Sequence, residues 1–264
     1  GYADAPVYKC PNCPTPQCYS TQPKCKGCDK SGEFVRAISF VDAPGHEALM
    51  ATMLSGAAVM DGAMLVIAAD EPCPQPQTRE HLVAIEIVGV KNLVIVQNKI
   101  DLVDEKRAFE SYQEIVNFVK GSIAEKAPII PVSAQHGVNI DVLIQALEEG
   151  VPTPKRDSTK PPRMHVVRSF DVNKPGTPAE KLAGGVIGGT ILQGVFKVND
   201  EIEIRPGLRV EKQGRAVYEP LFTEVVSLYV GGKTVEEAQP GGLVGVGTLL
   251  DPSLTKADGL IGNI

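Results

Sequence analysis

Apolar residues in the first half of the chain follow two spacings, and each spacing predicts a different element. Short continuous apolar runs predict buried strands, whereas apolar residues at i, i+3 and i+4 predict the buried face of a helix. Strands are expected at residues 34–41, 63–69, 93–97 and 128–132, and helices at residues 49–57, 78–88, 104–125 and 139–149. Continuous apolar strands that alternate with helices are typical of a parallel sheet covered on both faces, so this half is predicted to be α/β.

The hydrophobic pattern changes after Val151. Residues 152–162 are rich in proline and charge, which is typical of a stiff linker. Beyond them, short apolar runs are separated by glycine and proline, and this pattern predicts a β-barrel. Its strands are expected at residues 164–172, 185–192, 201–204, 225–230 and 243–247. The sequence therefore predicts an α/β domain over residues 1–151 and a β-barrel domain over residues 163–264.

The start of the chain shows neither spacing but is rich in cysteine. Cys10 and Cys13 form one C-x2-C pair, and Cys25 and Cys28 form a second. Two such pairs have the ligand spacing of a tetrahedral Zn²⁺ site, with disulfides as the alternative. A zinc knuckle is therefore predicted over residues 8–30. Four thiolates leave no open position on the metal, so the predicted site is structural rather than catalytic.

Three polar segments follow the ends of predicted strands in the first half. Ligands of open α/β sheets bind outside the carboxyl ends of the strands, so the three segments are expected to meet at one crevice. The segments are Asp42-Ala43-Pro44-Gly45-His46, Asn98-Lys99-Ile100-Asp101 and Ser133-Ala134-Gln135.

The second and third segments suit the recognition of guanine. A carboxylate at Asp101 can accept hydrogen bonds from both the ring N–H and the amino group of guanine, a contact that adenine cannot supply. Asn98 can reach the N7 side of the base and tie loops together. The stem of Lys99 can cover the ring, and the Ala134 N–H can donate to the guanine carbonyl. The alternative is that Asp101 only caps the following helix, but three segments in this order favour the guanine interpretation.

The first segment suits a sensor of the γ-phosphate. Asp42 can hold a water bound to Mg²⁺, and Gly45 leaves its N–H free for a close approach to phosphate. His46 then lies where a side chain can orient the attacking water. The alternative for His46 is a solvated histidine at the start of a helix, because a single histidine carries little information.

The order of DAPGH, NKID and SAQ, followed by a predicted β-barrel, resembles the translational GTPases of the elongation factor Tu type. The match narrows with the cysteine pairs, AAVMDGAMLVIAADEPCPQPQTREH, PIIPVSAQ and RSFDVNKPG. These runs resemble the gamma-subunit family of archaeal and eukaryotic translation initiation factor 2 over essentially the whole chain. The two C-x2-C pairs look more like the archaeal branch.

This resemblance implies a cytoplasmic GTPase that binds GTP or GDP with Mg²⁺. In its GTP form the family carries methionylated initiator tRNA to the small ribosomal subunit, together with alpha and beta subunits, and GTP hydrolysis releases the tRNA. The resemblance further implies that Asp42, Gly45 and His46 belong to the second switch, with His46 catalytic. Residues 98–101 and 133–135 would form the guanine pocket.

Composition limits how RNA can bind. The formal net charge of −6 excludes RNA binding through bulk positive charge, so affinity is expected to depend on a formed pocket. The strand at residues 184–194 is a candidate, because its small residues would let a nucleotide or amino acid approach the backbone. Glycines needed for bends of the barrel are an equally good explanation. The longest apolar run is far shorter than the roughly 18 residues of a membrane helix, so no membrane partner is expected.

The sequence departs from the family pattern at the phosphate site, because no G-x-x-x-x-G-K-[ST] motif occurs in it. We therefore expect an internal fragment that lacks the P-loop and the third domain and is inactive alone as a GTPase. Strands 34–41 and 63–69 are then expected not to pair directly, since the strand that leads to the P-loop would lie between them. The alternative function is a non-hydrolysing, zinc-containing scaffold or RNA-binding module on a GTPase-like fold.

Overall fold

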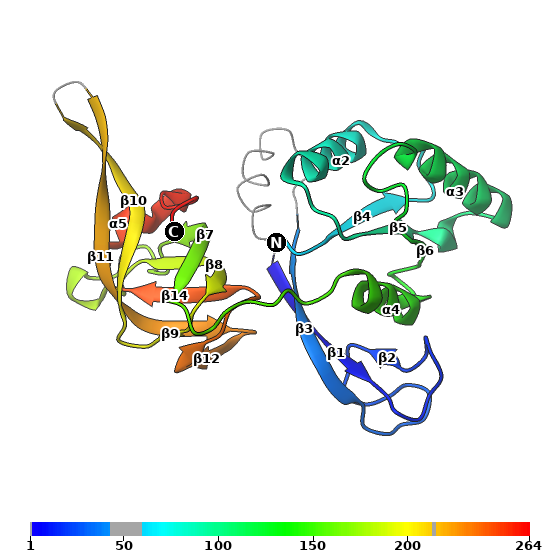
Figure 1. Ribbon diagram of the computed structural model, residues 1–264, viewed down its shortest axis with the longest axis horizontal. Helices are drawn as coiled ribbons and strands as arrows, with labels where there is room; N and C mark the ends of the chain where they lie inside the picture. The colour runs from blue at the N-terminus through cyan, green and yellow to red at the C-terminus, as the bar shows by residue number, and fades with distance from the viewer. Residues whose placement is uncertain (1, 43–59, 213–214) are drawn as a thin grey trace. The chain divides into compact units, whose positions relative to one another are not determined.

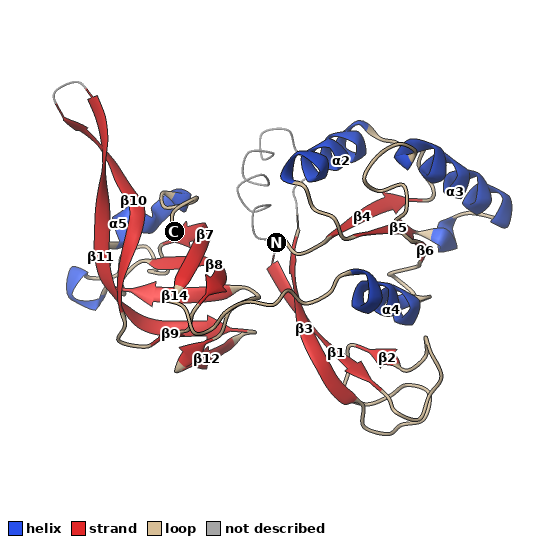
Figure 2. Cartoon of the chain, viewed as in Figure 1, coloured by secondary structure: helices blue, strands red, loops and turns tan. Residues whose placement is uncertain are grey.

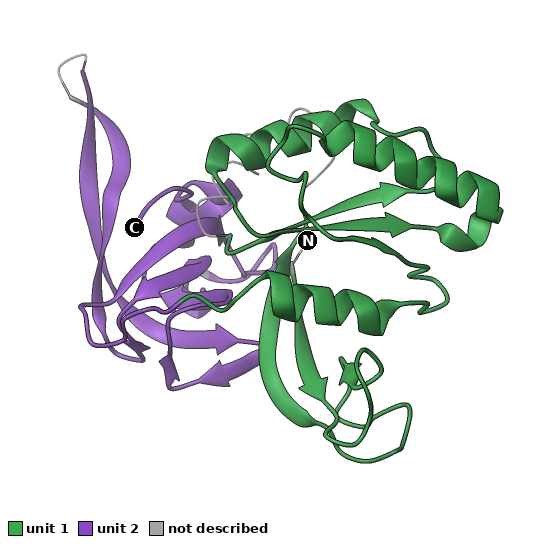
Figure 3. Ribbon diagram, turned by 45° about the vertical axis from the view of Figure 1, so that its right-hand side comes forward, with its two compact units in different colours: residues 1–154 green, residues 155–264 purple. Residues whose placement is uncertain are grey.

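The computed structural model describes residues 2–42, 60–212 and 215–264. The chain divides into two compact units, residues 1–154 and 155–264 (Figure 3). The division falls within the proline-rich segment at residues 152–162. No helix in the described part of the chain is long and apolar enough to cross a membrane.

A parallel sheet forms the centre of the α/β part of the first unit (Figures 1 and 2). Its order is β4 (Ala63–Ala68), β5 (Leu93–Asn98) and β6 (Ile129–Pro131), and each neighbouring pair of strands is parallel. Helices α2 (Pro76–Val88) and α3 (Glu105–Val119) lie on one side of the sheet, and α4 (Ile140–Gly150) lies on the other (Figure 1). The expected helix at residues 49–57 lies outside the described residues.

The central strand β5 is buried on both faces, as its continuous apolar run predicts, whereas Val66 of the edge strand β4 is 51% exposed. Leu65 of β4 and Ile95 of β5 pack with Ile115 of α3 in one apolar cluster. Val94 points to the opposite face because successive side chains of a strand alternate. It is fully buried and lies against Gly150 of α4. The predicted parallel sheet with helices on both faces is confirmed.

Helix α3 is shorter than the helix predicted over residues 104–125. Asp104 is its N-cap, and the Asp104 carboxylate accepts a hydrogen bond from the Arg107 N–H at 2.8 Å. The helix ends at Val119, and Gly121 follows with a φ of +78°, a conformation that costs glycine little. Ala124 is fully buried although it lies beyond the helix. The apolar period thus continues into a turn, which explains why the predicted helix was too long.

The N-terminal residues form a second, antiparallel sheet with the order β2–β1–β3. Its strands are β1 (Tyr2–Lys9), β2 (Tyr19–Ser20) and β3 (Glu33–Val41). The prediction that residues 34–41 join the parallel sheet is wrong, because β3 pairs along its whole length with β1. Within the described residues β3 shares no sheet with β4, as the expected gap between these strands requires. The sequence pattern concealed β1, since Val7 is the one buried side chain among residues 3–9 and Asp4 and Pro6 are poor strand formers.

Arg36 of β3 links this N-terminal sheet to helix α4. The Arg36 guanidinium donates to the Glu148 carboxylate at 2.7 Å, to the Thr153 hydroxyl at 2.9 Å and to the Leu147 carbonyl at 3.1 Å. The side chains of Arg36 and Glu148 are only 19% and 11% exposed. The bonds to Leu147 and Glu148 also satisfy groups at the carboxyl end of a helix, where a positive charge is favourable.

The second unit is built from antiparallel strands. The main sheet has the order β10–β11–β14–β8–β7, with β12 paired to β11, and β9 pairs separately with β13. Ile191 of β8, Leu228 of β11 and Val246 of β14 are fully buried in its core. The bounds are β7 (Arg163–Phe170), β8 (Val186–Gln193), β9 (Phe196–Lys197), β10 (Glu201–Lys212), β11 (Arg215–Val230), β12 (Lys233–Val235), β13 (Glu237–Ala238), β14 (Val244–Thr248) and the short helix α5 (Pro252–Thr255).

Strands β10 and β11 extend much further than their predicted ranges of 201–204 and 225–230. They form a long hairpin that projects from the rest of the second unit (Figure 1). In its outer part the side chains of Val217 and Tyr218 are exposed. An apolar pattern reports burial, so it detected only the part of each strand that covers the core.

The glycines of the segment at residues 184–194 pack against protein backbone. A Cβ at Gly184 would collide with the Thr248 carbonyl, and a Cβ at Gly189 would collide with the His165 carbonyl. A Cβ at Gly185 would meet the Thr255 side chain. The structure therefore supports the packing explanation of these glycines over a close approach by a ligand.

Candidate functional site

Three loops meet at the carboxyl edge of the parallel sheet. Because β4, β5 and β6 are parallel, the residues that follow them lie along the same edge. These are Asp70 after β4, residues 98–101 at the end of β5 and residues 133–135 after β6. Asp42 directly follows β3 of the other sheet and is exposed, whereas Gly45 and His46 lie outside the described residues.

Asn98 ties the three loops together. Its backbone carbonyl accepts the Ala69 N–H at 2.8 Å, which links the ends of β4 and β5. Its side-chain oxygen accepts the Ala134 N–H at 3.1 Å, which links β5 to the loop after β6. The Ala134 N–H that was expected to donate to a guanine carbonyl is thus already engaged, and the base would have to share this donor.

Lys99 occupies a backbone conformation that is uncommon for a side chain with a Cβ. Its φ is 64° and its ψ is 32°, in the left-handed region. The next residue, Ile100, donates its N–H to the Val132 carbonyl at 3.3 Å, so this bend holds the loop against β6. The Lys99 ammonium lies 3.5 Å from a carboxylate oxygen of Asp70.

Asp101 lies in the short 3-10 turn Ile100–Leu102 and has two partners from the loop after β6. The Ser133 hydroxyl donates to its carboxylate and lowers the pKa of Asp101, and the nearby His136 acts in the same direction. The His136 Nε2 lies 3.7 Å from an Asp101 oxygen. Ser133 is fully buried, and its oxygen also accepts the His136 N–H at 3.3 Å. A carboxylate held ionised in this way is a ready acceptor for two N–H donors of a base.

The interpretation of Asp101 as a helix cap does not hold. The N-cap of α3 is Asp104, three residues further along, and its carboxylate accepts the Arg107 N–H. Asp101 therefore has no capping role in α3. Gln135 follows Ala134 in an exposed turn.

The four paired cysteines converge into one cluster at the end of the N-terminal sheet. Their sulfur atoms all lie within 4.8 Å of one another. The Cys10 and Cys28 sulfurs are 3.5 Å apart, and those of Cys13 and Cys25 are 3.6 Å apart. A disulfide needs about 2.05 Å, so neither pair is bonded. A tetrahedral site with Zn–S bonds of about 2.3 Å has sulfurs about 3.8 Å apart, and the cluster fits this geometry.

The thiols of the cluster differ in pKa. A backbone hydrogen bond at Asn12 lowers the pKa of Cys10 to about 7. The Cys13 thiol donates to the sulfur of Cys28, which raises the pKa of Cys13 to about 12. Closely packed sulfurs cannot all ionise without a cation, and a bound cation is what would favour four thiolates.

Comparison with protein families identifies both units. Residues 28–153 match the elongation factor Tu GTP binding domain, and residues 184–257 match elongation factor Tu domain 2. Over the full chain, the translation initiation factor 2 subunit gamma of Pyrococcus horikoshii is 64% identical, and that of Methanothermobacter thermautotrophicus is 62% identical. Over its whole length the chain is therefore similar to the gamma subunits of translation initiation factor 2. It spans 64% and 65% of the lengths of these two relatives.

The chain is also similar in structure to other translation factors. Translation elongation factor SelB from Methanococcus maripaludis is 26% identical, with a TM-score of 0.65 over 82% of this chain and 44% of that chain. A bacterial selenocysteine-specific elongation factor is 25% identical, with a TM-score of 0.66 over 83% of this chain and 34% of that chain. The predicted fold class, a GTPase domain followed by a β-barrel, is confirmed.

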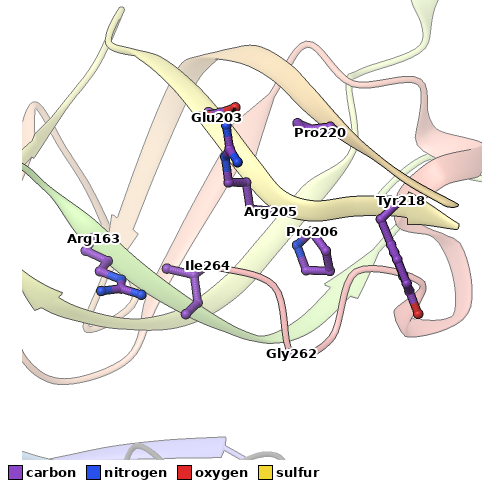
Figure 4. A pocket seen from close by; sticks show the side chains of 8 residues that line it. All are labelled: Arg163, Glu203, Arg205, Pro206, Tyr218, Pro220, Gly262 and Ile264. Carbon is purple, nitrogen blue, oxygen red and sulfur yellow. Dashed lines mark ion pairs between the residues drawn. The ribbon is translucent and has the colours of Figure 1, made fainter.

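Two hollows of about 620 Å³ each lie in the second unit of the chain. One is lined by Arg163, Tyr218 and Ile264 and by the Glu203–Arg205 ion pair (Figure 4). The other is lined by residues 168–171 and 173–177, together with Leu182 and residues 256–258. Neither contains any residue of the three loops described above.

Sequence reasoning missed three ionisable side chains around residues 98–101 and 133–135. Asp70 and His136 contact Lys99 and Asp101, and Arg107 contacts the loop that begins at Asp70. His136 directly follows the SAQ segment, so proximity in sequence could have indicated it. Asp70 and Arg107 belong to other elements, and only the fold brings them to this edge.

Proposed function

We propose that this chain is the guanine-recognising and partner-binding part of a translation initiation GTPase. In its GTP form, the whole protein would carry methionylated initiator tRNA to the small ribosomal subunit, in complex with alpha and beta subunits, and release it after GTP hydrolysis. The 60–64% identity to archaeal gamma subunits supports this proposal. The observation that carries it is the cluster of Asn98, Ala134 and Asp101 at one edge of a parallel sheet.

The guanine base is read by Asp101 in this proposal. The carboxylate accepts the ring N–H and the amino group, while Asn98 and Lys99 hold the N7 side and the ring face. Asp42 would hold Mg²⁺ through a water, Gly45 would approach the γ-phosphate, and His46 would orient the attacking water. Bound Mg²⁺ would neutralise charge on the phosphates.

A nucleotide-selectivity experiment tests this assignment. Asp101→Asn replaces the acceptor of two donors by an amide, which matches the carbonyl of xanthine better than the amino group of guanine. The preference of the purified chain for GDP over xanthosine diphosphate should therefore be lost or reversed. Asp104→Asn is the matched control, because Asp104 caps α3 and should leave the preference unchanged. Unchanged selectivity in Asp101→Asn, or no selectivity in the wild-type chain, would favour the scaffold interpretation.

We further propose that Cys10, Cys13, Cys25 and Cys28 hold one structural Zn²⁺. The mutual distances of their sulfurs support this assignment. The metal would cross-link the two turns that contain the cysteine pairs and would provide no open coordination position. The knuckle over residues 8–30 would then be a rigid element beside α4.

For tRNA, we propose recognition by shape and by the attached methionine rather than by bulk charge. The net charge of −6 supports this, because a protein that binds RNA mainly through phosphate contacts needs a positive surface. Methionylated initiator tRNA should bind the complete GTP-loaded protein more tightly than deacylated tRNA does. Equal binding of the two forms would contradict the proposal.

A further inference from the structure

Asp70, in the loop after β4, forms an ion pair with Lys99 of the loop at residues 98–101. The Lys99 ammonium lies 3.5 Å from the Asp70 carboxylate, with side chains 44% and 32% exposed. Lys99 has a left-handed backbone, so the direction of its side chain is set by an uncommon geometry. A lysine side chain is flexible and loses considerable rotamer entropy when it is held in place. A fixed anion beside the ammonium reduces the range of conformations that Lys99 samples.

The loop that starts at Asp70 is held by an ion pair on another element, through the backbone of Glu71 and Cys73. Arg107 of α3 donates to the Glu71 carbonyl at 2.8 Å and to the Glu114 carboxylate at 2.6 Å. The second oxygen of Glu114 accepts the Cys73 N–H at 2.8 Å. The loop that starts at Asp70 is therefore bound to α3 through one carbonyl and one N–H of its backbone.

The opposite charges of Arg107 and Glu114 favour the contacts that hold the loop after β4. The Arg107 guanidinium lowers the pKa of Glu114, which keeps the carboxylate ionised as an acceptor for the Cys73 N–H. The two charged side chains are about one-quarter and one-third exposed, so solvent screens them only in part. Arg107 can serve both acceptors because its guanidinium presents several donors in a rigid fork.

Helix α3 is also fixed to β5, the strand that leads into residues 98–101. The buried Gln97 of β5 donates its side-chain N–H to the Ala108 carbonyl of α3 at 2.7 Å. Asp104 caps the same helix directly after residues 98–101. Helix α3 therefore holds both the strand that leads to Lys99 and the loop that starts at Asp70. These two segments meet at the Asp70–Lys99 ion pair.

We propose that Asp70 is a positioning residue that orients Lys99 over a bound guanine base, and that Arg107 and Glu114 hold the Asp70 loop for this purpose. The inference rests on the proposed function, since it needs a guanine nucleotide at residues 98–101. Asp70 acts through Lys99 and touches no donor of the base. It therefore affects how tightly the nucleotide binds and leaves unchanged which base is preferred.

The test measures the affinity of the full chain for a fluorescent N-methylanthraniloyl derivative of GDP. Asp70→Asn should weaken binding about two- to fivefold, the range expected for a partly exposed ion pair. Asp70→Glu keeps the charge and should restore most of the affinity. The preference for GDP over xanthosine diphosphate should be the same in all Asp70 variants.

A double-mutant cycle shows whether Asp70 acts through Lys99. In a Lys99→Met background, Asp70→Asn should have no further effect on affinity. High salt should also reduce the difference between wild type and Asp70→Asn, because salt screens the ion pair. A residue that only stabilised the fold would weaken binding equally in both backgrounds and at both salt concentrations.

The supporting pair on α3 has a matched control on the same helix. Arg107→Lys keeps the charge but loses the fork, so it should weaken nucleotide binding by a similar factor to Asp70→Asn. Lys106→Met removes the exposed Lys106–Glu110 pair, which does not contact the loop, and should change nothing.

The outcomes separate this inference from the proposed function. Loss of affinity in Lys99→Met and loss of guanine preference in Asp101→Asn, with no effect of Asp70→Asn, would overturn the role of Asp70 alone. An equal effect of Asp70→Asn in both backgrounds would also overturn it. Wild-type chain that binds no guanine nucleotide would overturn both the inference and the proposed function.

Discussion

The N-terminal sheet and the parallel sheet lie in the same unit but are stabilised in different ways. In the parallel sheet, ten buried residues from β4, α2, β5, α3 and adjoining segments form one apolar cluster. In the N-terminal sheet, the buried cluster consists of Cys10, Cys18 and Cys25, with Tyr19 packed against it. Apolar burial accounts for the first region, whereas the second relies on its hydrogen-bonded strands and, in our proposal, on the zinc held by its cysteines.

This difference in stabilisation explains why the two regions have different sequence patterns. An apolar core requires many residues at regular spacing, so it leaves a periodic pattern. A metal site requires only four ligands at short spacing, and it can organise a segment that has no period at all. The two regions also meet through a polar contact, since Arg36 joins β3 to α4. Because the buried clusters of the two regions share no residue, the regions are nevertheless expected to lose structure separately.

Removal of zinc is the strongest way to separate the two regions. Small zinc-dependent folds owe about 10–16 kcal/mol of apparent binding free energy to the metal, so Cys25→Ser or chelation should disorder residues 8–30. The parallel sheet should stay folded, because its apolar cluster includes no residue of the knuckle. Hydrogen exchange together with measured zinc content checks this. Cys73→Ser is the control and should keep one zinc per chain, whereas global unfolding on chelation would contradict the separation.

The converse experiment weakens the parallel sheet. Ile95 is fully buried in β5, and Ile95→Ala should lower the free energy of unfolding by about 2–5 kcal/mol. Zinc content should remain unchanged, because the cysteine cluster lies in the other sheet. Urea unfolding followed by circular dichroism gives the loss of stability. Ile87→Ala on α2 is the matched control, since Ile87 is 75% exposed and its truncation should change stability by less than about 0.5 kcal/mol.

The contact between the two regions should have an intermediate effect. Arg36→Met leaves the Glu148 carboxylate and the Thr153 hydroxyl without their donor, which should cost about 1–3 kcal/mol. Hydrogen exchange should increase in β3 and at the end of α4 while zinc stays bound. Lys24→Met is the control, because the exposed Lys24–Asp29 pair lies within the knuckle and should matter little. Unchanged exchange at α4 in Arg36→Met would show that the sheets are held together by other contacts.

The smallest expected effect is the change in stability at low pH that comes from the Asp101 carboxylate. The pKa of Asp101 is lowered in the folded state, so its stabilising contribution is present above its unfolded pKa of about 3.9 and is lost as the pH falls through the folded value. Ser133→Ala should raise the pKa of Asp101, because the Ser133 hydroxyl is the main cause of the shift. Carboxyl titration by nuclear magnetic resonance measures this. Asp251 is the control, since its pKa is lowered by Ser253 and should not respond to Ser133→Ala.

The parts of the fold that could be predicted are those where local pattern and tertiary burial agree. The continuous apolar runs of β4 and β5 and the cysteine pairs are of this kind, and the structure contains both. Strand β1 and the outer hairpin of β10 and β11 bury few side chains, so their pairing left no apolar period. The end of α3 was misplaced because the buried Ala124 continues the period into a turn.

The sequence by itself determined the class of the protein, because the three polar segments, the two cysteine pairs and the change of pattern after Val151 are short-range features of the chain. Tertiary structure alone decided which charges meet. Arg36 and Glu148 are 112 residues apart in the chain, and Asp70 and Lys99 follow different strands of the parallel sheet. No local spacing encodes such pairs. Their energy depends on distance and exposure, and both quantities exist only after the apolar cores have brought the elements together.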